Sequence, residues 1–145
     1  MKLYEKESVN NKLFRLSEIT KILDELCSVS KEDFIKDATV NSAAMFNLLI
    51  GITIILDIGQ HLLAQFASRT AHEYKEVIKY LAEEKVVPRK FAEENESMVS
   101  FRNLLVHDYD KIDLVRVYEY LRKAPDIFRQ FVKYFVEFME KQPKS

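Results

Sequence analysis

Residues that break secondary structure are scarce in this sequence, which has only two glycines and three prolines among 145 residues. It also has no tryptophan. Glycine and proline supply most tight turns, so their scarcity argues against an all-β fold and against an α/β fold with glycine-rich loops. The lone cysteine, Cys27, excludes an intrachain disulfide, and the apolar periodicity around it predicts a buried small hydrophobe. A chain of this length can bury a core without disulfides or metal, so we expect one domain.

Several common functional motifs are also absent from the sequence. It contains no GxGxxG, no phosphate-binding P-loop, no CxxC pair and no HExxH, and we therefore expect neither a cofactor nor a metal site. The net charge of −1 argues against a protein that coats nucleic acid by charge alone, although it leaves room for a local basic cleft.

No segment has the composition of a membrane span or a targeting signal. The most apolar run, residues 48–56, has nine residues, whereas a span needs about 20. Charged residues occur throughout residues 1–26, so we expect no signal peptide. The sequence thus predicts a cytoplasmic protein with no membrane partner.

Apolar residues recur every three or four positions along most of the chain, which is the period of an amphipathic helix. The second of the predicted helices is apolar on nearly all sides, which indicates burial by several partners, and a dimer interface is one way to cover its surplus face. Pro125 should kink or split the last helix. The sum is an all-α, up-and-down bundle of four to five helices. The predicted helices span residues 9–28, 40–67, 72–84, 88–107 and 114–139.

The most informative segment is residues 101–113, FRNLLVHDYDKID, which places Arg102, His107 and Tyr109 near a predicted helix end. Arginine binds phosphate through a planar fork, and histidine gives or takes a proton near neutral pH. Together they suit metal-free RNA cleavage, in which a base takes the ribose 2′-hydroxyl proton and a cation stabilises the negatively charged phosphorus. On these residues alone a plainer alternative is stronger, because such side chains at a helix C-terminus often only satisfy its end carbonyls and dipole.

Two further candidates lie elsewhere in the chain. Asp57 and His61 are four residues apart and so share a face of the second helix, where they could pair or, with help, hold a metal. No third ligand is evident in the sequence, and a helix-surface pair is the simpler interpretation. Lys85, Arg89 and Lys90 form a small basic cluster that could touch RNA phosphates, but a solvated turn is again simpler.

The spacing Arg102-x4-His107-x-Tyr109 resembles the Rx4HxY motif of HepT-like proteins, a branch of the HEPN superfamily. The longer string FRN-x-LVH-x-Y-x-x-ID, followed by VY, resembles the pattern of the same family. Upstream, the segment ILDIGQH resembles its helix with an apolar–Asp–x3–His pattern. The resemblance covers about residues 10–138 and implies a single HEPN-type domain over residues 1–145.

This resemblance implies a dimeric helical bundle in which two motifs meet in one cleft. It also implies a metal-independent endoribonuclease that acts as the toxin of a toxin–antitoxin pair, with RNA and not DNA as its substrate. The implied partner is a minimal nucleotidyltransferase resembling MntA, which silences the toxin by attaching AMP to the motif tyrosine, here Tyr109. Asp57 and His61 would line the cleft or hold the dimer.

The resemblance also implies a role for each motif residue. Arg102 would stabilise the scissile phosphate, His107 would transfer protons, and Asn103 would orient the substrate. Tyr109 would be the site of modification and could stack on a base. The alternatives are a non-catalytic nucleotide- or partner-binding subunit of a minimal nucleotidyltransferase, and a plain structural bundle.

Overall fold

The computed structural model describes residues 3–143 of the chain, and within this range every regular element is a helix. The all-helical architecture predicted from the sequence is therefore confirmed. In chain order the elements are α1 (Leu3–Leu26), α2 (Lys31–Lys36), α3 (Ala38–Ala67), α4 (Tyr74–Glu83), α5 (Arg89–Glu94), α6 (Ser97–His107), the single 3-10 turn η1 (Tyr109–Lys111) and α7 (Leu114–Glu140).

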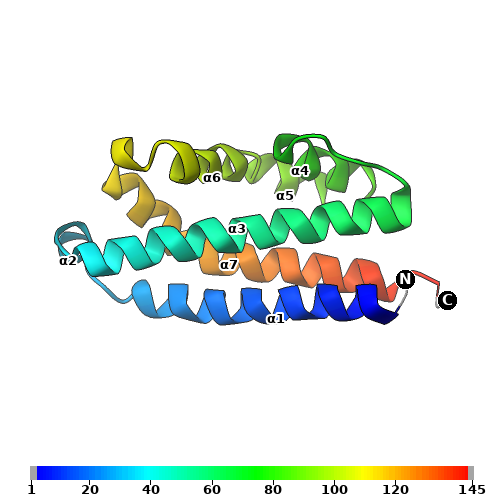
Figure 1. Cartoon of the computed structure of the whole chain (residues 1–145), viewed down its shortest axis with the longest axis horizontal. Coiled ribbons are helices and arrows are strands. Elements are labelled where there is room, and N and C mark those ends of the chain that lie inside the picture. The colour runs from blue at the N-terminus through cyan, green and yellow to red at the C-terminus, as the bar shows by residue number, and fades with distance from the viewer. Residues whose placement is uncertain (1–2, 144–145) are drawn as a thin grey trace.

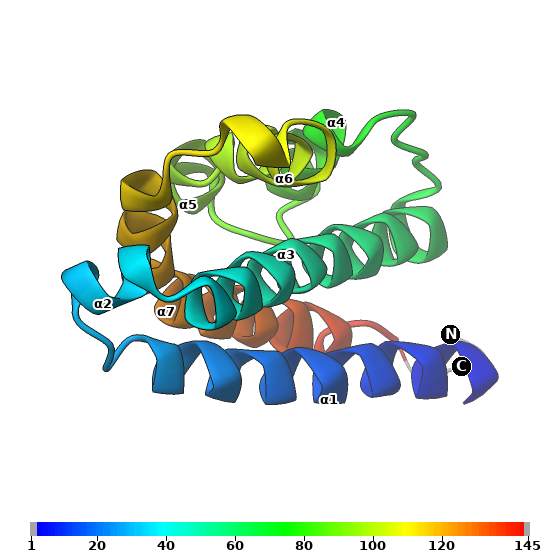
Figure 2. The same cartoon turned by 60° about the vertical axis from the view of Figure 1, so that its left-hand side comes forward.

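The helices are arranged in two layers that share α3 as their common member (Figure 1). On one side α3 packs against α1 and α7, and on the other it packs against α4 and α6. Figure 2 shows the same order from a second direction, with α4, α5 and α6 together above α3. α1 and α3 run in opposite directions, α6 runs back along α3, and α7 then runs in the direction of α3, as expected of an up-and-down bundle.

The central position of α3 explains its composition. Leu48, Ile52, Ile55, Leu56 and Leu62 are fully buried between the two layers. By length and composition α3 could cross a membrane, but 56% of its most apolar window is buried by the other helices. It is therefore the core helix of the bundle, as its all-round apolar sequence predicted.

Two glycines let neighbouring helices approach α3 closely. A Cβ atom on Gly51 would collide with the ring of Phe128 from α7, and one on Gly59 would lie 2.9 Å from Val77 Cγ1 of α4. The only two glycines in the chain thus lie at the contacts of α3 with each layer.

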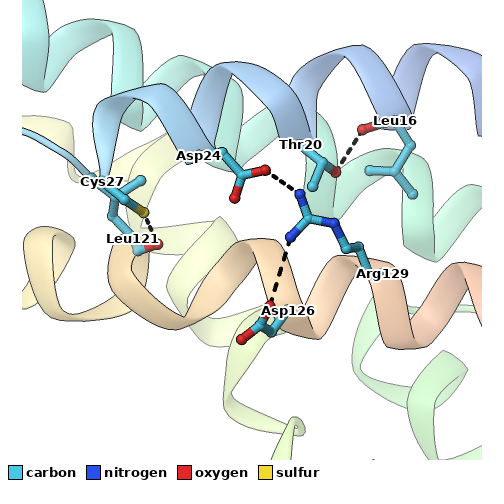
Figure 3. Close-up of polar contacts among 7 residues, drawn as sticks. All are labelled: Leu16, Thr20, Asp24, Cys27, Leu121, Asp126 and Arg129. Atoms are coloured by element: carbon cyan, nitrogen blue, oxygen red, sulfur yellow. Dashed lines mark hydrogen bonds and ion pairs between the residues drawn. The ribbon is translucent and has the colours of Figure 1, made fainter.

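Polar contacts line the seam between α1 and α7 (Figure 3). Arg129 of α7 pairs with Asp24 of α1 and lies 3.6 Å from Asp126, one turn earlier on its own helix. The buried Thr20 hydroxyl donates to the Leu16 carbonyl oxygen at 2.7 Å. The ion pairs of this seam are largely exposed to solvent and contribute little to stability, so burial of the apolar core accounts for most of it.

Pro125 lies inside α7, which continues past it without a break. Proline has no N–H to offer the Leu121 carbonyl oxygen four residues earlier. The thiol of Cys27, the residue that follows α1, donates to that oxygen instead, at 3.4 Å (Figure 3). Figure 2 shows the first turns of α7, in gold, at a steep angle to the rest of the helix. The predicted kink is confirmed, and the alternative of a split helix is not found.

Cys27 differs from its prediction. It is half-buried, not fully buried, and it acts as a hydrogen-bond donor as well as a packing residue. Burial raises the pKa of its thiol, which keeps the sulfur protonated and able to donate.

The prediction of one continuous helix over residues 88–107 is wrong. The segment forms α5 and α6, separated at Asn95 and Glu96. Asn95 is buried and bonds to the last turn of α5. Its Nδ2 donates to the Phe91 carbonyl oxygen at 2.8 Å, and its backbone N–H donates to the Ala92 carbonyl oxygen at 3.1 Å. A side chain that bonds to nearby backbone competes with helix continuation, and no proline or glycine marks this break.

Candidate active site

The candidate residues lie on α6 and the turn that follows it, in a region where α3 and α4 also meet. Arg102, Asn103 and His107 lie on α6, and Tyr109 follows in η1. Because α6 and α4 both pack on α3, the side chains of all three helices can meet there.

Arg102 is held by side chains from two helices. Its Nε donates to Thr53 Oγ1 of α3 at 2.7 Å, and its Nη1 donates to Asn103 Oδ1 at 3.1 Å. The Thr53 hydroxyl donates in turn to the Leu49 carbonyl oxygen at 2.8 Å, so its lone pairs are left to face the arginine. A guanidinium has five N–H donors, so most of them remain for a ligand. The side chain is therefore half-buried and fixed, yet still able to bind an anion.

The ring of Tyr74 from α4 lies beneath the same guanidinium. The Arg102 Cζ atom is 4.6 Å from the ring centroid, and the Tyr74 hydroxyl donates to Asp57 Oδ1 of α3 at 2.8 Å. Burial raises the pKa of Tyr74, and the hydrogen bond and charge of Asp57 raise it further, while Arg102 opposes the shift. Tyr74 thus contacts two charged groups: its hydroxyl binds the Asp57 carboxylate, and its ring face lies against the Arg102 guanidinium.

His107 and Tyr109 lie beyond the end of this network. Both are exposed, Tyr109 by 73% of its surface. In the part of the chain that the structure describes, neither side chain makes a hydrogen bond, an ion pair or a ring contact, with Arg102 or with any other residue. The structure therefore brings Arg102 and Asn103 together with Thr53 and leaves His107 and Tyr109 open to solvent.

The plainer alternative of helix capping does not account for Arg102. The Leu104 carbonyl oxygen near the end of α6 accepts the N–H of Asp108 at 2.9 Å. The bonds of Arg102 go to two side chains and none of them goes to a helix-end carbonyl.

Asp57 and His61 do not form the surface pair that their spacing allows. Asp57 accepts from Tyr74, and both residues line a pocket of about 540 Å³ between α1 and α3. The Nε2 atom of His61 is buried and has no hydrogen-bond partner. Within residues 3–143, no three His, Cys, Asp or Glu side chains are grouped so as to hold a metal.

The sequence interpretation missed the part that Thr53 and Tyr74 play in holding Arg102. A signal for Thr53 was present: Thr53, Asp57 and His61 follow one another at intervals of four in the mostly apolar second half of the helix, which places three polar groups on one stripe. Tyr74 had no comparable signal, because its position under Arg102 depends on how α4 folds back over α3.

An all-helical bundle with an Rx4HxY motif at the end of a helix defines a HEPN-type protein. The family model described as Ribonuclease HepT-like matches residues 16–135. The chain therefore belongs to the HepT-like family. The sequence match to the RNase candidate YutE of Bacillus subtilis (strain 168) is 27% identical over 89 residues, which are 61% of this chain and 62% of YutE.

Solved structures of similar proteins agree with this assignment. A HEPN toxin of Shewanella oneidensis, tri-AMPylated and in complex with an MNT antitoxin, superposes with a TM-score of 0.81 and 21% identity, over 89% of this chain and 96% of the toxin. The structure of YutE, described as a cytosolic protein of unknown function, superposes with a TM-score of 0.80 and 22% identity, over 97% of this chain and 95% of YutE. At these identities the likeness shows that the chain has the HEPN-type fold.

Proposed function

We propose that this protein is a metal-independent endoribonuclease that acts as the toxin of a toxin–antitoxin pair. The family match supports a single HEPN-type domain, and a cytoplasmic location accords with the description of YutE. The observation that carries the proposal is the immobilised Arg102, whose free donors lie on the same helix as an exposed histidine. A fixed cation and a titratable base are the two parts that metal-free RNA cleavage requires.

The proposed reaction uses the ribose of the RNA as its nucleophile. His107 takes the proton of the 2′-hydroxyl, and the 2′ oxygen attacks the adjacent phosphorus. The P–O5′ bond breaks, and the 5′ oxygen takes a proton from solvent, to which His107 releases the proton that it took. Arg102 stabilises the extra negative charge on the phosphorus oxygens, and Asn103 orients the substrate. The products are a 2′,3′-cyclic phosphate and a 5′-hydroxyl, so no metal-bound water is needed.

A second copy of the chain completes the cleft in this proposal. The outer face of α3 supports it, because Phe46 is 55% exposed and Leu49, Ile50 and Ile54 are only partly buried. Apolar surface of this kind marks an interaction site. A dimer would also set two Rx4HxY motifs around one RNA strand.

The proposed antitoxin is an MntA-like nucleotidyltransferase that modifies Tyr109. It would transfer AMP from ATP to the tyrosine hydroxyl, with release of pyrophosphate. The exposure of Tyr109 supports this step, because an enzyme must reach the hydroxyl. The added phosphate would place negative charge near Arg102 and fill the cleft. In the related Shewanella oneidensis complex the toxin is tri-AMPylated and bound to its MNT antitoxin.

A pair of matched oligonucleotides tests the proposed chemistry. A short RNA and its 2′-O-methyl counterpart are incubated with the unmodified protein in EDTA, and the fragment ends are identified by mass spectrometry. We expect cleavage of the RNA alone, with cyclic phosphate ends, and a loss of at least a hundredfold in Arg102→Ala. If the RNA stays intact although the oligonucleotide binds, the chain is instead the non-catalytic subunit of a nucleotidyltransferase.

A further inference from the structure

A second polar site lies beside the proposed active site, in the pocket between α1 and the C-terminal half of α3. Its volume of about 540 Å³ lies within the range of roughly 300–1,000 Å³ typical of small-molecule sites. The polar residues that line it come from three parts of the chain: Ser8, Lys12, Asp57, Gln60, His61, Arg69 and Thr70.

His61 gives the first sign that the pocket binds a ligand. Its Nε2 atom is buried and has no hydrogen-bond partner. Leaving a buried polar atom unpaired costs about 1–3 kcal/mol, and native proteins contain few such atoms. Neighbouring Asp57 does not relieve the cost, because no hydrogen bond joins it to His61 Nε2.

Lys12 gives the second sign, because its charge is not neutralised. Its ammonium donates to Ser8 Oγ at 3.2 Å and has no carboxylate partner among residues 3–143. Arg69, the other cation of the pocket, differs in this respect: its Nη1 lies 2.8 Å from Glu83 Oε2, and its guanidinium lies over the Tyr80 ring. Lys12 is therefore the cation that is free to meet an anionic ligand.

Asp57 connects the pocket to the proposed active site. It lines the pocket and also accepts from the Tyr74 hydroxyl, and the ring of Tyr74 lies beneath Arg102. A ligand in the pocket is thus connected to Arg102 through two side chains that contact each other, Asp57 and Tyr74.

We propose that this pocket is a subsite for one nucleotide of the substrate RNA, next to the phosphate held at Arg102. Lys12 would pair with a phosphate, Asp57 would accept from a base amino group, and His61 would form the hydrogen bond that it lacks. The presence of Asp57 favours a nucleotide over a bare phosphate, which the carboxylate would repel. The inference rests on the proposed function, because it takes RNA as the ligand.

Binding of a non-cleavable RNA tests the subsite. A 2′-O-methyl oligonucleotide is titrated by fluorescence anisotropy against wild type, Lys12→Met and His61→Gln, with Lys21→Met as the matched control on the exposed side of α1. We expect about tenfold weaker binding for Lys12→Met, with a salt slope smaller by about 0.7, and wild-type binding for Lys21→Met. In cleavage assays Lys12→Met should raise KM and leave kcat unchanged.

Two outcomes would overturn the subsite. One is equal binding of the oligonucleotide by wild type and both pocket variants. The other is that the two pocket variants bind 5′-AMP more weakly than wild type does but bind the oligonucleotide equally well. That result would assign the pocket to a free nucleotide. Because the anisotropy assay needs no cleavage, an oligonucleotide that binds through Lys12 while natural RNA stays intact would retain the subsite and refute the ribonuclease.

Discussion

Arg102 is positioned by three contacts from three helices: a hydroxyl of α3, the amide of the next residue on α6, and an aromatic ring of α4. Hydrogen bonds with a charged partner contribute about 1.5–3 kcal/mol each. Thr53 matters most for direction, because its bond to Nε fixes the plane of the guanidinium. The orientation of the proposed phosphate fork therefore depends on a residue outside the Rx4HxY motif.

Thr53→Val should test this dependence, because valine keeps the shape of threonine and removes the hydroxyl. We expect kcat/KM for RNA cleavage to fall about tenfold to a hundredfold, which is what a loss of 1.5–3 kcal/mol would produce. Thr53→Ser retains the hydroxyl and should keep most of the activity. Equal rates for the valine and serine variants would show that Thr53 does not position Arg102.

Two nearby tyrosines of α7 offer a matched test of hydrogen bonding in the fold. The Tyr118 hydroxyl donates to the Val29 carbonyl oxygen at 3.0 Å, whereas the Tyr120 hydroxyl is buried without a partner. Tyr118→Phe should lower the free energy of unfolding by about 1 kcal/mol, and Tyr120→Phe should leave it unchanged or raise it. Urea titrations measure both, and the reverse order would contradict the described contacts.

Tyr120 also predicts how stability depends on alkaline pH. Burial raises its pKa above the ordinary value of 10, so the folded chain keeps a proton that the unfolded chain loses. Stability should therefore be unaffected by this group below pH 10 and should fall as the pH rises above it. Tyr120→Phe should flatten that fall in urea titrations across the alkaline range. An unchanged slope would contradict the burial of the hydroxyl.

At the scale of the elements, the sequence predicted the helices wherever apolar periodicity was sustained. The observed α3 and α7 match the predictions to within two residues, because each buries a continuous stripe. The break between α5 and α6 was not predictable, since it depends on the bonds of the Asn95 side chain to its own backbone. Likewise, Arg102 was found from its motif, but Tyr74 was not, because its role arises from tertiary packing.

The kink of α7 at Pro125 should couple that residue to Cys27. If the Cys27 thiol replaces the donor that Pro125 lacks, the two residues are coupled through the Leu121 carbonyl oxygen. Cys27→Ala should then lower the free energy of unfolding more in the wild-type background than in the Pro125→Ala background, where a backbone N–H is restored at residue 125. A double-mutant cycle of unfolding free energies should give a coupling of about 0.5–1 kcal/mol. Additive effects would show that the thiol contributes only packing.

At the scale of the whole molecule, the two layers cover α3 incompletely and leave part of one face exposed. Phe46 lies on this face with 55% of its surface accessible, although the helix is otherwise the core of the bundle. A second copy of the chain would bury this face and bring a second Rx4HxY motif to the proposed cleft. Activity and self-association should therefore be lost together.

Phe46→Glu tests the proposed dimer by placing a charge on that face. We expect the dissociation constant of the dimer to rise at least tenfold in sedimentation analysis, because burying an unpaired carboxylate costs well over 1 kcal/mol. Phe14→Glu is the control, since Phe14 is also exposed but lies on α1. A dimer that tolerates Phe46→Glu would place the interface elsewhere.

We propose that the protein cuts RNA with Arg102 and His107 and without a metal. The decisive experiment incubates total cellular RNA in EDTA with wild type and with His107→Ala, both shown by intact mass to carry no AMP. We predict cleavage by wild type and a loss of about a hundredfold or more in His107→Ala, the contribution typical of a general base. Intact RNA with unmodified wild type, or equal cleavage by both proteins, would contradict the account.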